Sequence, residues 1–247
     1  MKRAVDVAVS SVGLIALSPV MAMAGAAIWL TDRQSPLFIS FRCGRGGIPF
    51  KMLKFRTMFS GAHLTGVSST SNSDPRITPV GRFLRATKVD ELPQLVNVLR
   101  GDMSLVGPRP NIQRAIQGYS AEEREMLTVR PGITDFASIV FADEGDILAD
   151  SLDPDLTYEQ LIRPGKSRLA LFYVSRQTTS VDAQIMWLTV LNSWNRVVAL
   201  RQLAALLARL GAPADLVRIA SREHPLEAAP PPGMTEVIRS IDAPVGP

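Results

Sequence analysis

The sequence predicts an α+β, mostly helical fold, and three observations point to it. The chain has 247 residues, enough to bury a substantial core in one or two domains. Its hydrophobic fraction is 46% and its mean hydropathy is +0.13, which excludes intrinsic disorder for most of the chain. Several long segments repeat apolar residues at helical spacing, whereas β structure is expected only in a hairpin or loop over 36–58 and a short strand over 133–141.

The composition excludes several classes of site. Cys43 is the single cysteine, so the chain has no internal disulfide framework and no zinc site built on cysteine pairs. The two histidines, His63 and His224, are too few and too far apart for the usual histidine metal cluster. The net charge of +4 is mild. It favours an anionic small substrate or a membrane surface as partner, and we expect no nucleic acid.

The N-terminal segment carries no charge from Val7 to Leu30. As a helix it would be about 36 Å long, enough for a bilayer core of about 30 Å. Three interpretations compete: a signal peptide cleaved after Ala22-Met23-Ala24, a kinked transmembrane span, and a re-entrant helix that enters and leaves by the same face. Basic residues on both flanks place both ends on the cytoplasmic side, and Ser18-Pro19 near the middle would kink the helix. The residues alone leave all three open.

The elements after this segment follow from turn and helix signals. Residues 60–80 are polar and rich in glycine and serine, typical of a loop or mobile lid. Residues 81–100 are expected to be helical up to Arg100-Gly101, with one apolar stripe formed by Leu92, Leu95, Val96 and Leu99. This stripe would lie either in the membrane interface or against the protein. The prolines around Arg109 require a non-helical, extended turn over 106–110.

The second half of the chain is mainly helical in pattern. Helices are expected over 111–128, 156–162, 168–174 and 181–208, the last with a break near 192–195. Residues 224–233 include three consecutive prolines and are interpreted as a flexible tail. We expect three parts: a membrane helix over 1–32, a central domain over 33–200, and a helical extension with a proline-rich tail over 201–247. The leucine- and alanine-rich helix of the extension could form an interfacial or dimer contact.

A dense cluster of charged residues lies between residues 51 and 109, and Asp90-Glu91 stands in its middle. A carboxylate pair at a helix start is usually a cap, stabilised by the helix dipole, and this remains one interpretation. The other interpretation is a phosphate-binding active site, because such a pair can hold Mg²⁺ while arginines and lysines nearby bind phosphate oxygens. A carboxylate can also attack phosphorus, and the chain offers no glycine-rich phosphate loop and few other nucleophiles.

Several strings of residues carry a resemblance. They are KMLKFRTM from Lys51, DPRITPVGRFLRATKVDELPQLVNVLRGDMSLVGPRP from Asp74, and PGIT from Pro131. An N-terminal Lys-Arg-x-x-Asp and the central Ser18-Pro19 accompany them. Over roughly residues 1–200 the chain resembles the bacterial sugar transferase family, the monotopic phosphoglycosyl transferases.

The resemblance implies a fold, a location and a reaction. The N-terminus would be a re-entrant helix-break-helix in one leaflet of the bacterial inner membrane, with its break at Ser18-Pro19. A small catalytic domain with interfacial amphipathic helices would lie on the cytoplasmic face. Such enzymes transfer a sugar-1-phosphate from a UDP-sugar to a polyprenol phosphate, such as undecaprenyl phosphate, and release UMP. This is the first membrane step of a bacterial glycan pathway, for a polysaccharide or a glycoconjugate.

The resemblance also assigns residues. Asp90 would attack the phosphorus that carries the sugar, giving a covalent intermediate and ping-pong kinetics. Glu91 would assist proton handling or metal placement, and the cofactor Mg²⁺ would bind at Asp90. The residues expected near the substrates are Lys54, Arg56, Arg76, Arg85, Arg109 and Asp182. The oligomeric state, including a homo-oligomer, stays open.

Two departures from the family pattern leave the sugar undetermined. Ser35-Pro36 stands where Gly-Pro is usual, and residues 135–138 read Asp-Phe-Ala-Ser where many members carry Gly-x-Ala-Gln.

Two alternative functions are retained. One is a non-catalytic, membrane-associated partner in a glycan assembly complex, and the other is a hydrolase of lipid diphosphates that uses the same carboxylate site.

Overall fold

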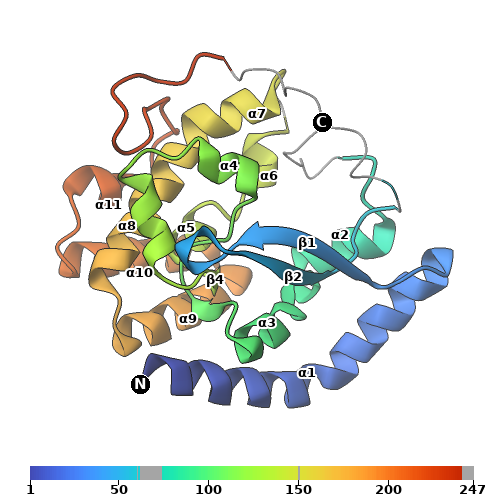
Figure 1. Cartoon of the computed structure of the whole chain (residues 1–247). Coiled ribbons are helices and arrows are strands. Elements are labelled where there is room, and N and C mark those ends of the chain that lie inside the picture. The colour runs from blue at the N-terminus through green and yellow to red at the C-terminus, as the bar shows by residue number, and fades with distance from the viewer. Residues whose placement is uncertain (60, 62–73, 150, 241–247) are drawn as a thin grey trace.

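The computed structural model describes residues 1–59, 61, 74–149 and 151–240. A long N-terminal helix, α1 (Lys2–Asp32), runs along one side of a mostly helical domain with two small two-stranded sheets (Figure 1). The prediction of an α+β, mostly helical fold is therefore confirmed. The remaining elements, in chain order, are β1 (Leu37–Cys43), η1 (Arg45–Gly47), β2 (Pro49–Phe55), α2 (Pro79–Ala86), η3 (Val89–Glu91), α3 (Gln94–Arg100), β3 (Ser104–Val106), α4 (Gln113–Gln117), η4 (Glu123–Thr128), β4 (Gly132–Thr134), α5 (Phe136–Val140), α6 (Glu144–Ile147), α7 (Pro154–Thr157), η5 (Tyr158–Ile162), α8 (Arg163–Arg176), α9 (Thr179–Trp194), α10 (Arg196–Arg209) and α11 (Ala214–Ser221).

Helix α1 is continuous over 31 residues and contains Pro19. Figure 1 shows it as two segments that meet at an angle near its middle. Pro19 has no N–H to donate to the carbonyl of Ile15 four residues earlier. The Ser18 hydroxyl donates to that carbonyl instead, at 2.8 Å. The expected break at Ser18-Pro19 is therefore a bend within one helix, with the freed carbonyl satisfied locally.

The first turns of α1 are bound to the domain by buried polar contacts. Lys2 Nζ forms an ion pair with Asp182 at 2.6 Å and donates to the carbonyl of Val106 at 2.9 Å. The buried carboxylate of Asp6 accepts from the Ser104 hydroxyl at 2.9 Å and from the Leu105 N–H at 3.1 Å. The charged groups that precede the apolar segment thus fix its start against β3 and α9.

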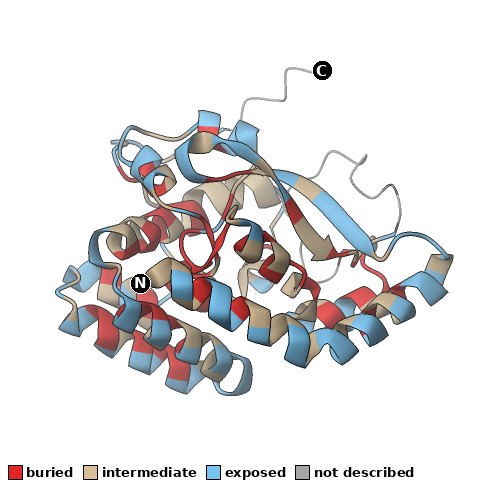
Figure 2. Cartoon of the chain, turned by 60° about the horizontal axis from the view of Figure 1, so that its bottom comes forward, coloured by how far each residue is buried: buried red, intermediate tan, exposed pale blue. Residues whose placement is uncertain are grey.

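The last turns of α1 are bound as well, while its middle is exposed. Ala24 and Ile28 pack against Phe55 and Leu84, and Asp32 pairs with Arg56 at the end of β2. Between the two attachments, large apolar side chains face outward, with exposures of 66% at Val12, 77% at Ile15 and 65% at Met23 (Figure 2). Within the described residues, α1 is the one helix long and apolar enough to cross a membrane.

The two sheets are an antiparallel hairpin and a short parallel pair. Strands β1 and β2 form an antiparallel hairpin in which Phe38 pairs with Lys54 and Arg42 pairs with Phe50, as expected for residues 36–58. Strands β3 and β4 are parallel, and the turns beside them cross closely. A Cβ on Gly132 would lie 2.1 Å from the nitrogen of Gly107, so both positions require glycine.

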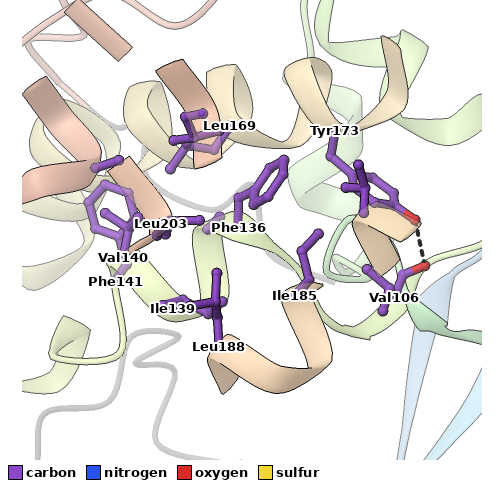
Figure 3. Packing of buried hydrophobic residues seen from close by; sticks show 14 of the residues in the cluster. Val106, Phe136, Ile139, Val140, Phe141, Leu169, Tyr173, Ile185, Leu188 and Leu203 are labelled. Carbon is purple, nitrogen blue, oxygen red and sulfur yellow. Dashed lines mark hydrogen bonds between the residues drawn. The ribbon is translucent and has the colours of Figure 1, made fainter. Parts of the chain in front are cut away.

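The hydrophobic core lies between α5, α8, α9 and α10 (Figure 3). Phe136 and Tyr173 are fully buried and meet edge to face, with ring centroids 6.0 Å apart. Leu203 and Leu207 of α10 and Ala220 of α11 belong to the same cluster. The core therefore continues through the helices that follow residue 200.

Residues 81–100 differ from the prediction of one helix. The segment forms α2, the short turn η3 and α3, because Lys88 adopts a left-handed backbone (φ 58°) that ends the first helix. The expected stop at Arg100-Gly101 is confirmed, since Gly101 has φ 90°. Of the apolar stripe, Leu95 is buried and packs in the core, which supports the protein-facing interpretation for that residue.

Two further predictions need correction. The strand expected over 133–141 ends at Thr134, because Asp135 accepts from the N–H of Ser138 and starts helix α5. The tail over 224–233 is attached rather than free: Pro231 and Pro232 are buried, and Ser120 donates to the carbonyl of Pro232 at 2.6 Å.

The other helix predictions are confirmed in whole or in part. The break near 192–195 occurs between α9 and α10. The region 111–128 contains only the short α4 and η4. Most of the loop or lid expected over 60–80 falls on residues 60 and 62–73, outside the described residues.

Candidate active site

The Asp90-Glu91 pair lies on η3, the single turn between α2 and α3. Lys88, just before it, holds the left-handed conformation without being a glycine, which costs about 1 kcal/mol or more. The chain then turns back into a right-handed helix through Pro93. This local reversal presents the two carboxylates at a junction between elements rather than on a helix face.

Asp90 is buried, with 7% exposure. Its side chain receives no hydrogen bond or ion pair from the described residues, and its Oδ1 is fully buried. Burial and, next, the charge of Glu91 raise the pKa of Asp90, partly offset by Lys54, Lys88 and Arg85. The helix-cap interpretation is wrong for this residue, because a capping carboxylate would accept a backbone N–H.

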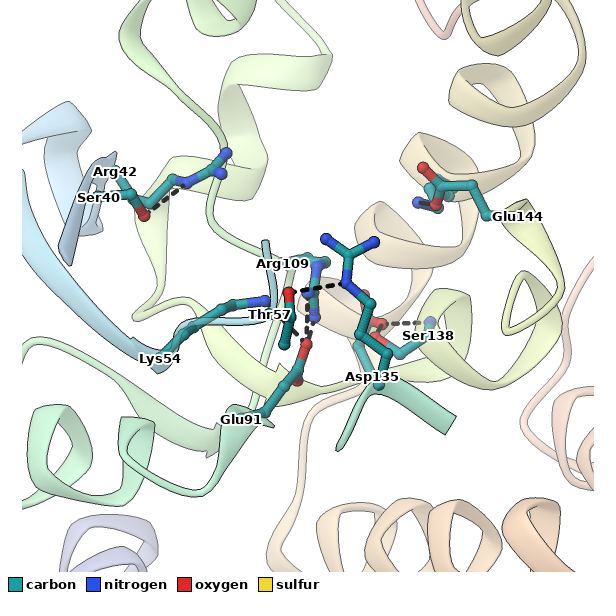
Figure 4. Close-up of polar contacts among 11 residues, drawn as sticks. Ser40, Arg42, Lys54, Thr57, Glu91, Arg109, Asp135, Ser138 and Glu144 are labelled. Carbon is teal, nitrogen blue, oxygen red and sulfur yellow. Dashed lines mark hydrogen bonds and ion pairs between the residues drawn. The ribbon is translucent and has the colours of Figure 1, made fainter. Parts of the chain in front are cut away.

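Glu91 is held on both sides by positive charge (Figure 4). Its carboxylate accepts from Lys54 Nζ at 3.0 Å and from Arg109 Nη2 at 2.6 Å. Burial alone would raise the pKa of Glu91, but the charges of Arg109 and Lys54 outweigh it and hold this pKa well below its usual range. Glu91 is therefore ionised and joins β2 to the Pro-Arg-Pro turn.

The structure separates the other expected site residues into two groups. Arg85 donates to the Thr57 hydroxyl at 2.9 Å, and its charge acts on Asp90. Together with Lys54 and Arg109 it surrounds the carboxylate pair. The remaining three form ion pairs with residues outside the Asp90-Glu91 pair: Arg56 with Asp32, Arg76 with Asp74, and Asp182 with Lys2. Of these, the Arg76–Asp74 pair is near enough to Arg85 for its charges to act on that residue.

Arg42 belongs to the site and was not singled out from the sequence. Every second residue of a strand lies on the same face, so Phe38 and Arg42 share one face of β1. Phe38 pairs with Lys54 of β2, which puts Lys54 on that face of the hairpin as well. Figure 4 shows Lys54 reaching toward Glu91 and Arg109, and Arg42 farther out, next to Ser40. Burial and the charge of Arg109 lower the pKa of Arg42. The strand alternation was the signal that could have identified it.

Opposite this hairpin, other polar groups complete the surroundings (Figure 4). Asp135 is almost fully buried and accepts from the Ser138 hydroxyl at 2.6 Å. Glu144 pairs with Lys166. The negative charges of Asp135 and Glu144 contribute to the raised pKa of Arg109, after the larger effect of Glu91.

The residues fit Mg²⁺ at Asp90. Among the described residues, no group of three or more histidine, cysteine, aspartate and glutamate side chains is arranged to hold a metal ion. Mg²⁺, however, is commonly bound by one or two carboxylates together with substrate phosphates and water. Asp90 offers such a ligand, since its oxygens are not engaged by other described residues.

Asp90 is a buried carboxylate without a partner among the described residues, and lysine and arginine side chains lie near it, which are the groups needed for phosphoryl transfer to a carboxylate. The domain that holds this site also carries the long apolar helix α1. The chain belongs to the bacterial sugar transferase family, whose model matches residues 1–196.

Individual relatives act on different sugars. A UDP-glucose:undecaprenyl-phosphate glucose-1-phosphate transferase of Caulobacter vibrioides is 43% identical over 141 residues, covering 56% of this chain and 53% of the relative. An undecaprenyl-phosphate glucose phosphotransferase of Komagataeibacter xylinus is 36% identical, covering 76% and 35%. A UDP-N-acetylgalactosamine-undecaprenyl-phosphate N-acetylgalactosaminephosphotransferase of Aeromonas hydrophila is 33% identical, covering 64% and 38%. The chain thus spans about half or less of the length of these relatives.

Proposed function

We propose that this protein transfers a sugar-1-phosphate from a UDP-sugar to a polyprenol phosphate, with undecaprenyl phosphate as the acceptor, and releases UMP. The observation that carries the proposal is the contrast between the two carboxylates. Glu91 is clamped by Lys54 and Arg109, whereas Asp90 beside it is buried and has no partner among the described residues. The named activities of the relatives support the donor and acceptor classes.

In the first half-reaction, a carboxylate oxygen of Asp90 attacks the phosphorus that bears the sugar. The bond from that phosphorus to the bridging oxygen breaks, and UMP leaves with the bridging oxygen and its electron pair. Arg109 and Arg42 supply positive charge for the diphosphate, because two neighbouring guanidinium groups are stabilised by an anion between them. Glu91 keeps Lys54 and Arg109 in place while negative charge passes from the Asp90 carboxylate to the departing UMP.

In the second half-reaction, an oxygen of the polyprenol phosphate attacks the phosphorus of the phosphosugar on Asp90. The carboxylate leaves with its electron pair, and the product is a polyprenol diphosphate sugar. Because one product leaves before the second substrate reacts, the kinetics are ping-pong. Mg²⁺ held at Asp90 would neutralise charge on the diphosphate.

The lipid acceptor requires the site to lie at a membrane, and the proposed arrangement is a re-entrant α1 in one leaflet. A straight helix of this length would place its ends on opposite sides of a bilayer core of about 30 Å. Here both ends of α1 are attached to the same domain, and the exposed apolar residues lie around the bend at Pro19. The proposal places the domain on the cytoplasmic face of the bacterial inner membrane.

The testing experiment measures UMP release by the detergent-solubilised chain. A panel of UDP-sugars is supplied with Mg²⁺, with and without undecaprenyl phosphate. We expect sustained UMP release with one or a few donors, only when the lipid is present, and a phosphosugar adduct on Asp90 by mass spectrometry when it is omitted. Asp90→Asn should abolish both signals, while Glu125→Gln, at an exposed position, should change neither.

The other outcomes favour the alternatives. Sustained UMP release without the lipid would support a hydrolase. No release with any donor, from protein that remains folded, would support a non-catalytic partner in a glycan assembly complex. Full activity of Asp90→Asn would remove Asp90 as the nucleophile.

A further inference from the structure

Two buried polar groups, one on η3 and one at the start of α3, have no partner among the described residues. Gln94, the first residue of α3, is 1% exposed, and its Nε2 donates to no described residue. The Oδ1 of Asp90 is likewise buried and accepts from none. An unpaired buried donor or acceptor destabilises the folded state, because it has lost its hydrogen bonds to water.

The two side chains lie on one helical face. Leu92 and Pro93, between them, both have right-handed helical backbone angles (φ −55°, ψ −36° and φ −60°, ψ −18°). The turn η3 therefore runs into α3 without a change of hand. Residues four apart in such a segment are neighbours on the same face. The Nε2 of Gln94 is a hydrogen-bond donor and the Oδ1 of Asp90 is an acceptor, so the two groups could form a hydrogen bond with each other.

We propose that Gln94 is a positioning residue for Asp90: its side-chain amide donates to Oδ1 of Asp90 when the UDP-sugar is bound, and so directs Oδ2 at the phosphorus. This inference rests on the proposed function. An amide suits the role because it is neutral and can hold one oxygen without neutralising the nucleophile. The positive charge near Asp90 already comes from Lys54, Arg85 and Lys88.

The test uses Gln94→Met, which preserves the shape of the side chain and removes the donor. The full chain in detergent, with Mg²⁺ and a UDP-sugar that the unaltered protein accepts, is followed in single turnover without lipid. We expect the maximal rate of adduct formation on Asp90 to fall by about a hundredfold. The donor concentration that gives half the maximal rate should stay within about twofold, because binding groups are unchanged. The melting temperature should be unchanged or higher, because an unpaired buried amide has been removed.

A control is Asn192→Leu on α9, which removes another side-chain amide, one whose Oδ1 is buried and has no partner among the described residues. It should keep both the melting temperature and the rate. Gln94→Leu serves as a second variant, with the same expected outcome as Gln94→Met. The proposal is overturned if Gln94→Met reacts at the unaltered rate, if its loss appears only as weaker donor binding, or if both Gln94 variants lose stability in step with activity. An unaltered protein that forms no adduct would contradict the proposed function instead.

Discussion

The attachment of the start of α1 gives the most demanding prediction. Asp6 and Ser10 are one turn apart on the same helix, and both are buried. Asp6 accepts two hydrogen bonds, from Ser104 and Leu105, whereas the Ser10 hydroxyl has no partner among the described residues. Asp6→Leu should therefore be costly, and Ser10→Ala should be nearly neutral or slightly stabilising.

The magnitude follows from the contacts that are lost. Hydrogen bonds to a carboxylate contribute about 1.5–3 kcal/mol each, so the loss of both in Asp6→Leu should cost about 3–6 kcal/mol. In a domain of this size that lowers the melting temperature by about 10 °C. Asp6→Asn keeps one acceptor, and we expect about half of this loss. The assay is thermal unfolding in detergent micelles, followed by tryptophan fluorescence.

A double-mutant cycle sharpens the test. Combining Asp6→Leu with Ser104→Ala should cost less than the sum of the two single changes, by about 1 kcal/mol, because both remove the same hydrogen bond. Equal effects of Asp6→Leu and Ser10→Ala, or strict additivity in the cycle, would refute the reasoning that these polar contacts hold the start of α1.

Three further predictions concern the bend, the strand crossing and the cofactor. Pro19→Ala should straighten α1 locally but leave both ends on one side of the membrane, because contacts outside the bend hold them. Cysteine-accessibility labelling of the two helix ends checks this, and labelling of the ends from opposite sides would contradict it. Gly132→Ala should destabilise the chain by about 4 kcal/mol or more, since its Cβ would lie 2.1 Å from the Gly107 nitrogen. Gly118→Ala should be tolerated, because the atom nearest to its Cβ lies 3.6 Å away. Soluble yield and melting temperature compare the two variants, and equal stability would argue against the close crossing of the turns beside β3 and β4. EDTA should stop UMP release and Mg²⁺ should restore it, and an unaffected rate would remove the metal from the proposal.

Local signals predicted the elements whose causes lie within a few residues. The hairpin over 36–58 follows from strand-like residues around glycines, and the helix end at Gly101 from a residue that tolerates positive φ. The division of 81–100 was missed because Lys88, not a glycine, adopts the left-handed conformation there. The start of α5 was missed because Asp135 caps it directly after a strand.

The sequence by itself determined that α1 is a long apolar helix with a proline near its middle, and that Asp90-Glu91 stands in a basic neighbourhood. Tertiary structure alone decided which carboxylate is free. Glu91 is held by Lys54 and Arg109, which lie 37 and 18 residues away in the chain. Such contacts leave no periodic trace in the sequence, because they depend on how β2 and the turn after β3 meet η3. Burial and pairing then give two adjacent carboxylates opposite pKa shifts.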